Sequence, residues 1–153
     1  MSGIATGSPE QTRAFGEKLA AQLLPGDVVV LFGRMGAGKS ELARGIARGL
    51  GVVETVSSPT FTILQVYDSG RLPFCHFDWY RLRGVEELGE LSMEEYLGGE
   101  GVAVVEWPER AAGAIPADHL RITLTPLGEE EREILLEPVG GFHPLRMDFD
   151  GLA

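Results

Sequence analysis

The run Gly33–Ser40 is the feature that most restricts how this chain can fold. It reads Gly-Arg-Met-Gly-Ala-Gly-Lys-Ser and fits the pattern G-x-x-x-x-G-K-[ST]. The five apolar residues before it, Val28–Phe32, predict a strand that is buried on both faces of a sheet. A helical pattern follows from about Lys39 to Leu50. A strand, a glycine-rich loop and a helix in this order predict a phosphate-binding P-loop, and a plain glycine turn is the alternative.

Each position of this loop has a physical reason. Glycines let successive backbone N–H groups curve around a phosphate without Cβ clashes. The Lys39 ammonium would bind the β- and γ-phosphates of a nucleotide, and the Ser40 hydroxyl would complete the shell of a Mg²⁺ ion. The loop positions that we expect to bind the nucleotide are Gly33, Met35, Gly36, Ala37, Gly38, Lys39, Ser40 and Glu41.

Two acidic residues follow predicted buried strands. Glu106 ends the run Val102–Val105, and Asp78 ends the run that begins at Phe74. An ionised carboxylate at the end of a buried strand is costly unless it meets a cation, and P-loop enzymes hold magnesium with such an acid. We therefore expect Ser40, Glu106 and Asp78 to bind the metal, although each acid could simply cap the next turn. Glutamate departs from the aspartate that usually ends this strand.

A third candidate lies between the P-loop helix and the next extended run. The residues Ser57-Ser58-Pro59-Thr60 lie where many P-loop proteins carry a hydroxyl that senses the γ-phosphate. We expect Thr60 to take part in catalysis with Lys39, and a proline turn is the alternative interpretation. His76 and Cys75 do not form a metal-binding pair, because adjacent residues of a strand point to opposite faces.

Composition limits the class of protein. The chain has 153 residues, of which 44% are apolar, and this predicts one domain over residues 1–140 with a flexible tail over 141–153. No apolar stretch approaches the roughly 20 residues that span a bilayer, so we expect no membrane association. The first residues lack the features of a secretory signal, and the lone Cys75 favours a reducing cytoplasm.

Charge and missing residue types limit the ligands. The net charge is −10, with nine basic and seven acidic residues over 1–83 and four basic and sixteen acidic residues over 84–153. This balance argues against nucleic-acid binding by phosphate neutralisation and places an anionic ligand on the first half. The sequence has no asparagine, and guanine selection usually employs an Asn-Lys-x-Asp element. We therefore expect ATP as substrate, with ADP as product, together with Mg²⁺.

The remaining pattern predicts the fold class. A helix begins after the N-cap Ser8 and continues to Leu24, where Pro25-Gly26 ends it. Other expected elements are extended runs over 60–67 and 73–78, an acidic amphipathic helical stretch over 85–97, a short helix after Pro108, and a hairpin over 120–136. The prediction is an α/β, three-layer P-loop NTPase domain whose mixed sheet has a parallel core over 28–32 and 102–106 and antiparallel additions.

Several motifs together resemble one family. They are LFGRMGAGKSELARGI, SSPTFTILQVY, HFDWYRL, EELGELSMEEYL and VVEWPER, and they cover roughly residues 8–137. This chain resembles the TsaE family, the small P-loop ATPases required for bacterial threonylcarbamoyladenosine modification of tRNA. The resemblance implies ATP hydrolysis in support of a separate two-subunit tRNA threonylcarbamoyl-transferase, rather than chemistry on the tRNA.

The resemblance also implies residue roles. Glu106 matches the metal-associated acid, Asp78 acts at the metal or on the attacking water, and Thr60 matches a switch element. Trp107 is implied as a partner or nucleotide contact. Ser8 and Arg132 fall where the family cradles adenine. Ser40 replaces the commoner threonine and preserves the hydroxyl.

Two other functions stay open from the sequence. A small-molecule kinase needs the same loop and also a lid, and the interval Asp68–Arg83 is too strand-like for one. A non-hydrolysing nucleotide-sensing module would keep Lys39 and Ser40 but would tolerate the loss of Asp78 and Glu106.

Overall fold

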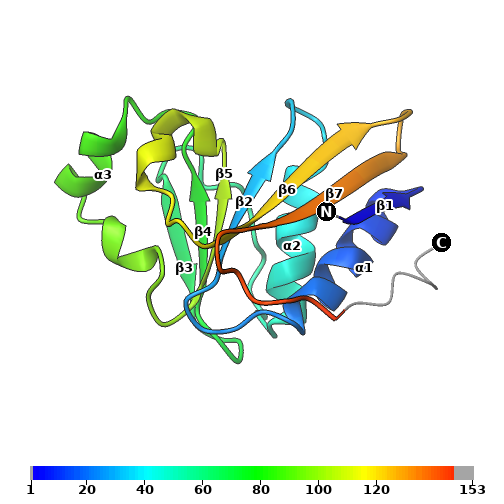
Figure 1. Cartoon of the computed structure of the whole chain (residues 1–153), viewed down its shortest axis with the longest axis horizontal. Coiled ribbons are helices and arrows are strands. Elements are labelled where there is room, and N and C mark those ends of the chain that lie inside the picture. Colours follow the sequence, from blue (N-terminus) through cyan, green and yellow to red (C-terminus); the bar gives the residue numbers. More distant parts are fainter. Residues whose placement is uncertain (1, 147–153) are drawn as a thin grey trace.

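Buried apolar strands form the centre of the structure, a computed structural model that describes residues 2–146 (Figure 1). Val28, Val30, Val104 and Val105 are at most 1% exposed, as the unbroken apolar runs around them predicted. The elements in chain order are β1 (Ser2–Thr6), α1 (Pro9–Ala20), β2 (Val28–Phe32), α2 (Lys39–Gly49), β3 (Leu64–Tyr67), β4 (Phe74–Asp78), α3 (Val85–Glu90), η1 (Glu94–Tyr96), β5 (Val102–Glu106), η2 (Pro108–Ala114), β6 (His119–Pro126) and β7 (Arg132–Val139).

The seven strands form one mixed sheet in the order β1-β7-β6-β2-β5-β4-β3. The four central strands β6, β2, β5 and β4 run parallel to one another, whereas β3, β7 and β1 pair antiparallel with their neighbours. The predicted parallel core of β2 and β5 is confirmed. Each hairpin also adds one strand parallel to that core, so four strands end at the same edge of the sheet.

Helices cover both faces of the sheet. On one face α1 and α2 pack against each other and over a core that includes Phe15, Ile46 and Val104. On the other face α3, η1 and η2 lie over a second core that includes Leu88, Trp79 and Val105. The structure thus has three layers, with helix, sheet and helix in turn.

A close approach of α1 and α2 sets the position of α2. A Cβ atom on Gly45 would lie 2.2 Å from the carbonyl oxygen of Arg13, so only glycine fits at this crossing. Because α2 begins at Lys39, this packing fixes where the glycine-rich loop ends.

Several predicted elements differ from the structure. Strand β1 was not predicted, and it pairs with β7 through Ile4 and Ile134. Strand β3 begins at Leu64 instead of residue 60, because Ile63 adopts a positive φ of 70° and donates its N–H to the carbonyl of Pro59. Helix α1 ends at Ala20 and is followed by a turn over residues 21–22, so the predicted last turn of the helix up to residue 24 is not helical. The acidic stretch over 85–97 divides into α3 and η1.

The predicted tail is described only up to residue 146. Phe142 packs against the larger core, the N–H of Gly141 donates to Asp118, and Nε2 of His143 lies 2.6 Å from Oδ2 of Asp27. Residues 147–153, the larger part of the predicted flexible tail, lie outside the described residues. Over residues 2–146, the structure contains no helix with the length and apolar character needed to cross a bilayer.

Candidate active site

A cleft of about 420 Å³ opens beside the carboxyl ends of β2, β4 and β5. This is where ligands bind in open α/β sheets. The residues that line it are Met35, Gly36, Gly38, Lys39, Ser40, Glu41, Ser58, Thr60, Asp78, Tyr80, Glu106, Trp107 and Arg132. Most of the predicted site residues therefore share one cavity.

The glycine-rich loop adopts backbone angles that its glycines permit. Gly36 and Gly38 have φ values of 83° and 101°, in the left-handed region that other residues rarely occupy. Gly33 is also confined, because a Cβ there would lie 2.9 Å from the carbonyl oxygen of Leu124. Gly38 is the N-cap of α2, so the positive end of this helix faces the cleft.

Lys39 is held at the base of the cleft. Its side chain is largely buried, and Nζ donates to the carbonyl oxygen of Gly33 at 2.6 Å. Nζ also lies 3.6 Å from the ring centroid of Trp107. Burial lowers the pKa of Lys39 below the usual 10.5, and the nearby carboxylates of Glu106, Glu109 and Asp78 oppose this shift.

Asp78 and Glu106 end neighbouring parallel strands in register, and both are 3% exposed. Oε1 of Glu106 lies 3.5 Å from the Ser40 hydroxyl, and Oε2 lies 2.6 Å from Nε2 of His76. These two carboxylates and one hydroxyl are oxygen donors of the kind that Mg²⁺ prefers. Residues 2–146 contain no group of three or more His, Cys, Asp or Glu side chains placed to hold a metal ion. The two carboxylates and the Ser40 hydroxyl fit Mg²⁺ held by one or two carboxylates together with phosphate oxygens.

The loop before β3 reaches Asp78 through two hydroxyl groups. Ser58 Oγ and Thr60 Oγ1 each donate to Oδ2 of Asp78 at 2.9 Å. The N–H of Tyr80 donates to Oδ1, also at 2.9 Å. The structure thus brings Thr60 to the strand-end carboxylate, and it adds Ser58 from the same predicted segment.

Arg132 reaches the glycine-rich loop from β7. Its Nε donates to the carbonyl of Ala37 at 3.0 Å, and a terminal nitrogen donates to the carbonyl of Gly36 at 3.1 Å. Ser8 is not among the residues that line the cleft. Its hydroxyl caps α1 by accepting from the N–H of Gln11.

Other predicted positions have structural partners of their own. Ala37 is fully buried and does not line the cleft. Glu41, in the first turn of α2, forms ion pairs with Arg13 and, at 2.8 Å, with Arg44. Trp107 has a left-handed φ of 59° directly after β5, and its ring lies 5.0 Å from that of Tyr80.

Besides Ser58, two residues of the site were not assigned a role from the sequence. His76 contacts Glu106, and Tyr80 lines the cleft two residues after Asp78. The spacing His76-x-Asp78 was a usable signal, because residues two apart on a strand share a face. The alternation argument against a His76–Cys75 pair is confirmed, since Cys75 belongs to the core on the opposite face.

Comparisons with known proteins agree with this arrangement. The family model described as "Threonylcarbamoyl adenosine biosynthesis protein TsaE" matches residues 6–134. The tRNA threonylcarbamoyladenosine biosynthesis protein TsaE of Bacillus subtilis (strain 168) is 42% identical over 135 residues, which are 88% of this chain and 84% of the relative. The protein of the same name from Treponema pallidum (strain Nichols) is 42% identical over 127 residues, 83% of this chain and 93% of the relative.

A solved structure is similar throughout. The crystal structure of Bacillus subtilis YdiB superposes with a TM-score of 0.79 and 38% sequence identity, and the match covers 91% of this chain and 86% of that one. The matched family model spans most of the chain, and the resemblance seen in the motifs is thereby confirmed. The chain belongs to the threonylcarbamoyl adenosine biosynthesis protein TsaE family.

Proposed function

We propose that this protein is a Mg²⁺-dependent ATPase that serves tRNA threonylcarbamoyladenosine biosynthesis. The matching family and the relatives, which are named for this biosynthesis, support the assignment of the protein to it. One observation carries the activity: the P-loop Lys39 and the strand-end carboxylates of Asp78 and Glu106 line one cleft of a size suited to a nucleotide. The same arrangement supports a P-loop NTPase fold.

The loop and its neighbours would bind and orient the triphosphate. The N–H groups of the loop and the N-terminus of α2 attract phosphate oxygens. Lys39 adds a point charge, and Arg132 fixes two loop carbonyls so that the cradle is preorganised before ATP binds. Trp107, above Lys39, covers the ammonium and limits its access to water.

The two carboxylates would have different roles, one in binding Mg²⁺ and the other in orienting water. Ser40 and Glu106, with Asp78 nearby, would hold Mg²⁺, which when bound neutralises charge on the β- and γ-phosphates. Asp78, whose oxygens accept from Ser58, Thr60 and the backbone, is the group that we assign to orient the attacking water. The Thr60 hydroxyl is the group that we assign to sense the γ-phosphate.

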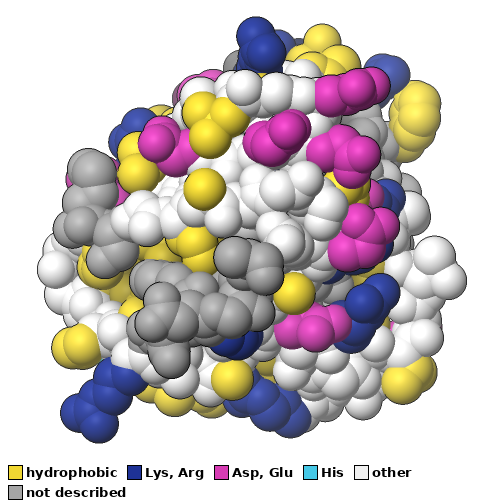
Figure 2. All heavy atoms as spheres, turned by 90° about the vertical axis from the view of Figure 1, so that its right-hand side faces the viewer, with side chains coloured by type: hydrophobic (Ala, Val, Ile, Leu, Met, Phe, Trp, Pro, Cys, Tyr) yellow, Lys and Arg dark blue, Asp and Glu magenta, His cyan; other side chains and the backbone are white. Residues whose placement is uncertain are grey.

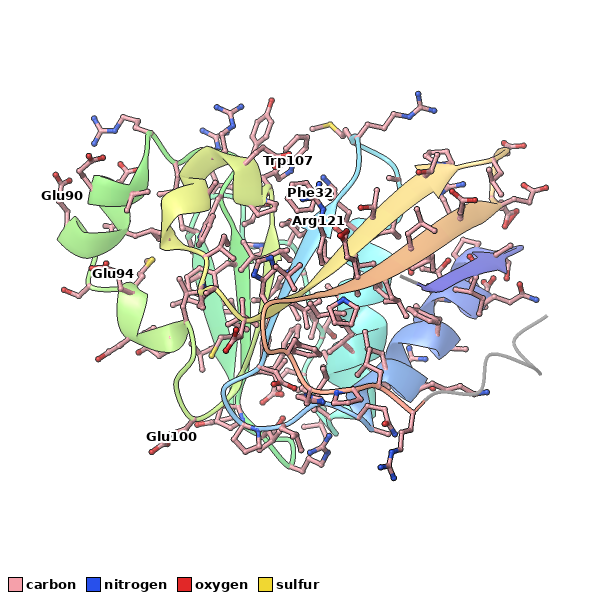
Figure 3. All side chains as sticks on the ribbon, in the orientation of Figure 1. Phe32, Glu90, Glu94, Glu100, Trp107 and Arg121 are labelled. Carbon is pink, nitrogen blue, oxygen red and sulfur yellow. The ribbon has the colours of Figure 1, made fainter. Side chains whose placement is uncertain are left out.

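The surface favours a protein partner over tRNA. Glu90, Glu94 and Glu100 extend outward from the α3 and η1 side of the molecule (Figure 3). The face that carries β1 also shows several acidic side chains, mainly in its upper part (Figure 2). Such a surface repels a phosphate backbone. We infer that the protein acts in the cytoplasm on the two-subunit threonylcarbamoyl-transferase.

The cations of the cleft suggest how the activity is regulated. Lys39 and Arg132 are the basic residues that line it over residues 2–146, and Arg132 is already bound to loop carbonyls. An arginine finger supplied by the partner would complete the site, as in other P-loop enzymes. We therefore expect slow intrinsic hydrolysis that increases when the transferase pair is present.

The test is ATP turnover of the wild type and of Lys39→Ala, Asp78→Asn and Glu106→Gln, each with and without the transferase pair and Mg²⁺. We expect Mg²⁺-dependent hydrolysis that each substitution lowers by about 10²-fold or more. Glu100→Gln, outside the cleft, is the matched control. Nucleotide binding that Lys39→Ala abolishes, with no ATP turnover by the wild type even when the transferase pair and Mg²⁺ are present, would indicate a non-hydrolysing nucleotide sensor. Phosphate found on an added acceptor would indicate a kinase.

A further inference from the structure

His76 and Glu106 form a buried side-chain pair beneath the cleft. His76 is 1% exposed on β4, Glu106 is 3% exposed on β5, and the His76 Nε2 atom lies 2.6 Å from Oε2 of Glu106. In the parallel register His76 pairs with Val104, so Glu106 lies two residues further along its strand on the same face. The imidazole therefore supports the carboxylate from the closed end of the site.

The two oxygens of Glu106 face different partners. Oε2 is engaged by His76, and Oε1 lies toward the Ser40 hydroxyl at 3.5 Å. A free glutamate side chain rotates about three bonds, and a hydrogen bond to one oxygen removes most of that freedom. Since a carboxylate facing a cation has only acceptors, Nε2 carries the hydrogen atom in this pair. His76 thus leaves Oε1 free to face the cleft.

Asp78 is held in a different way. Its partners are the hydroxyls of Ser58 and Thr60 and a backbone N–H, all of which come from loops at the mouth of the cleft. Glu106, by contrast, is held by a residue of the sheet itself. Loops move more readily than a central strand, so Glu106 is the carboxylate with the fixed position.

The Nδ1 atom of His76 bears on the role of the imidazole ring. Within the described part of the chain, Nδ1 of His76 is buried and has no hydrogen-bond partner. Most buried polar side-chain atoms do have partners. The ring lies 5.6 Å from that of Phe74 in the apolar core, where a leucine would pack at no polar cost. The retained polar contact of this ring is the one to Glu106.

We propose that His76 is a positioning residue that holds Glu106 in the orientation required to bind the nucleotide-associated divalent cation. This inference rests on the proposed function for the role of Glu106. Hydrogen-bond partners of metal ligands orient the ligand, and their loss typically lowers metal affinity or activity by about 10–100-fold.

The experiment measures cation binding separately from hydrolysis. Mn²⁺ is titrated into the ADP-bound full-length protein, and free Mn²⁺ is followed by electron paramagnetic resonance. The variants are His76→Gln, whose amide nitrogen reaches about as far as Nε2, and His76→Asn, whose amide is too short to reach Glu106. His76→Leu removes the donor, and Phe74→Leu perturbs the same part of the core without touching Glu106.

We expect His76→Leu and His76→Asn to weaken Mn²⁺ affinity by about 10–100-fold, while His76→Gln stays within about threefold of the wild type. ADP affinity without metal should be unchanged in all of them. Phe74→Leu should lower the Tm yet leave Mn²⁺ affinity intact. If His76→Leu does not fold, the Gln and Asn variants alone decide the question.

Equal Mn²⁺ affinity in the Gln and Asn variants would overturn the positioning role, and so would a wild type that binds no Mn²⁺ in the presence of ADP. The proposed function fails separately. If the wild type hydrolyses no ATP with the transferase pair but the Mn²⁺ pattern holds, the ATPase proposal is wrong and the inference about His76 stands.

Discussion

The Nζ atom of Lys39 lies 3.6 Å from the centroid of the Trp107 indole and 2.6 Å from the carbonyl oxygen of Gly33. The ammonium is thus bound on two sides before any phosphate arrives. A cation over an indole face is stabilised by about 0.5–2 kcal/mol, which is less than a charge-assisted bond to phosphate can supply. A nucleotide should therefore draw Lys39 away from Trp107.

This competition predicts a fluorescence signal. Adding ATP with Mg²⁺ should change the emission of Trp107, because the charge next to its ring is redistributed. The variant Trp107→Phe should lose the change, and Trp79→Phe, whose ring is fully buried in the core beneath α3, should keep it. Unchanged emission of the wild type on nucleotide binding would show that the two side chains stay in contact, and a response that persists in Trp107→Phe would assign the signal to Trp79.

Lys39→Met should stabilise the protein while it abolishes nucleotide binding. Burial lowers the pKa of Lys39, so the charged form is less favourable in the folded chain than in the unfolded one. We expect the Tm to rise by about 2–4 °C at pH 7, the shift that about 1 kcal/mol produces in a domain of this size.

The gain should depend on pH in a defined direction. The unfolded chain holds the lysine proton more tightly, so wild-type stability rises as pH increases from the folded pKa toward 10.5. The difference in Tm between Lys39→Met and the wild type should therefore be largest near pH 7 and should shrink toward pH 10. A difference that grows with pH contradicts this reasoning.

The elements that carry the site were predictable from local patterns, but the contacts between its residues were not. The apolar runs of β2 and β5 and the glycine spacing predict the strand, loop and helix without further information. The register of Asp78 against Glu106 depends on which strands are neighbours, and this is a property of the whole sheet.

The missed features share a physical cause. Strand β1 is short, and its pairing with β7 depends on a partner more than 120 residues away along the chain. The turn at Ile63, a β-branched residue at positive φ, overrides the preference of its side chain for an extended strand. His76 and Arg132 acquire their roles through partners 30 and 95 residues distant. Tertiary packing decides such contacts.

Gly45→Ala should destabilise the fold although alanine is the better helix former. Its Cβ would lie 2.2 Å from the Arg13 carbonyl oxygen, so α1 and α2 must separate. Overpacking of this kind costs about 1–3 kcal/mol, more than the roughly 1 kcal/mol that alanine gains in a helix. Urea denaturation should show the loss. Gly113→Ala is the control, because its nearest neighbour, Val85 Cγ2, would be at 3.4 Å.

Cys75 should be almost inert toward thiol reagents in the folded protein. Burial raises the pKa of its thiol to about 11, so only about one thousandth is thiolate at pH 8. Modification followed by absorbance should be slow without denaturant and fast in urea, with a rate that tracks opening of the sheet. Fast labelling of the native protein would mean that β4 is accessible from the α3 side.

The contact between His143 and Asp27 should stabilise the fold in a pH-dependent way. Burial is the largest single effect and opposes charge on this ring, but the hydrogen bond to Asp27, the contact with the Pro144 carbonyl oxygen and the charge of Asp27 together outweigh it and raise the pKa of His143. A raised folded pKa stabilises the fold fully below the unfolded value of about 6.5, and the contribution is lost as pH rises through the folded pKa. His143→Gln should therefore lower the free energy of unfolding by about 1 kcal/mol at pH 5.5 and by less at pH 8.5.

Urea denaturation at the two pH values measures this difference. Arg146→Gln is the control, because the backbone of Arg146, and not its side chain, makes the hydrogen bond to Gln22. An equal loss at both pH values would mean that the ring stabilises the segment by packing on Phe142 and not through its charge.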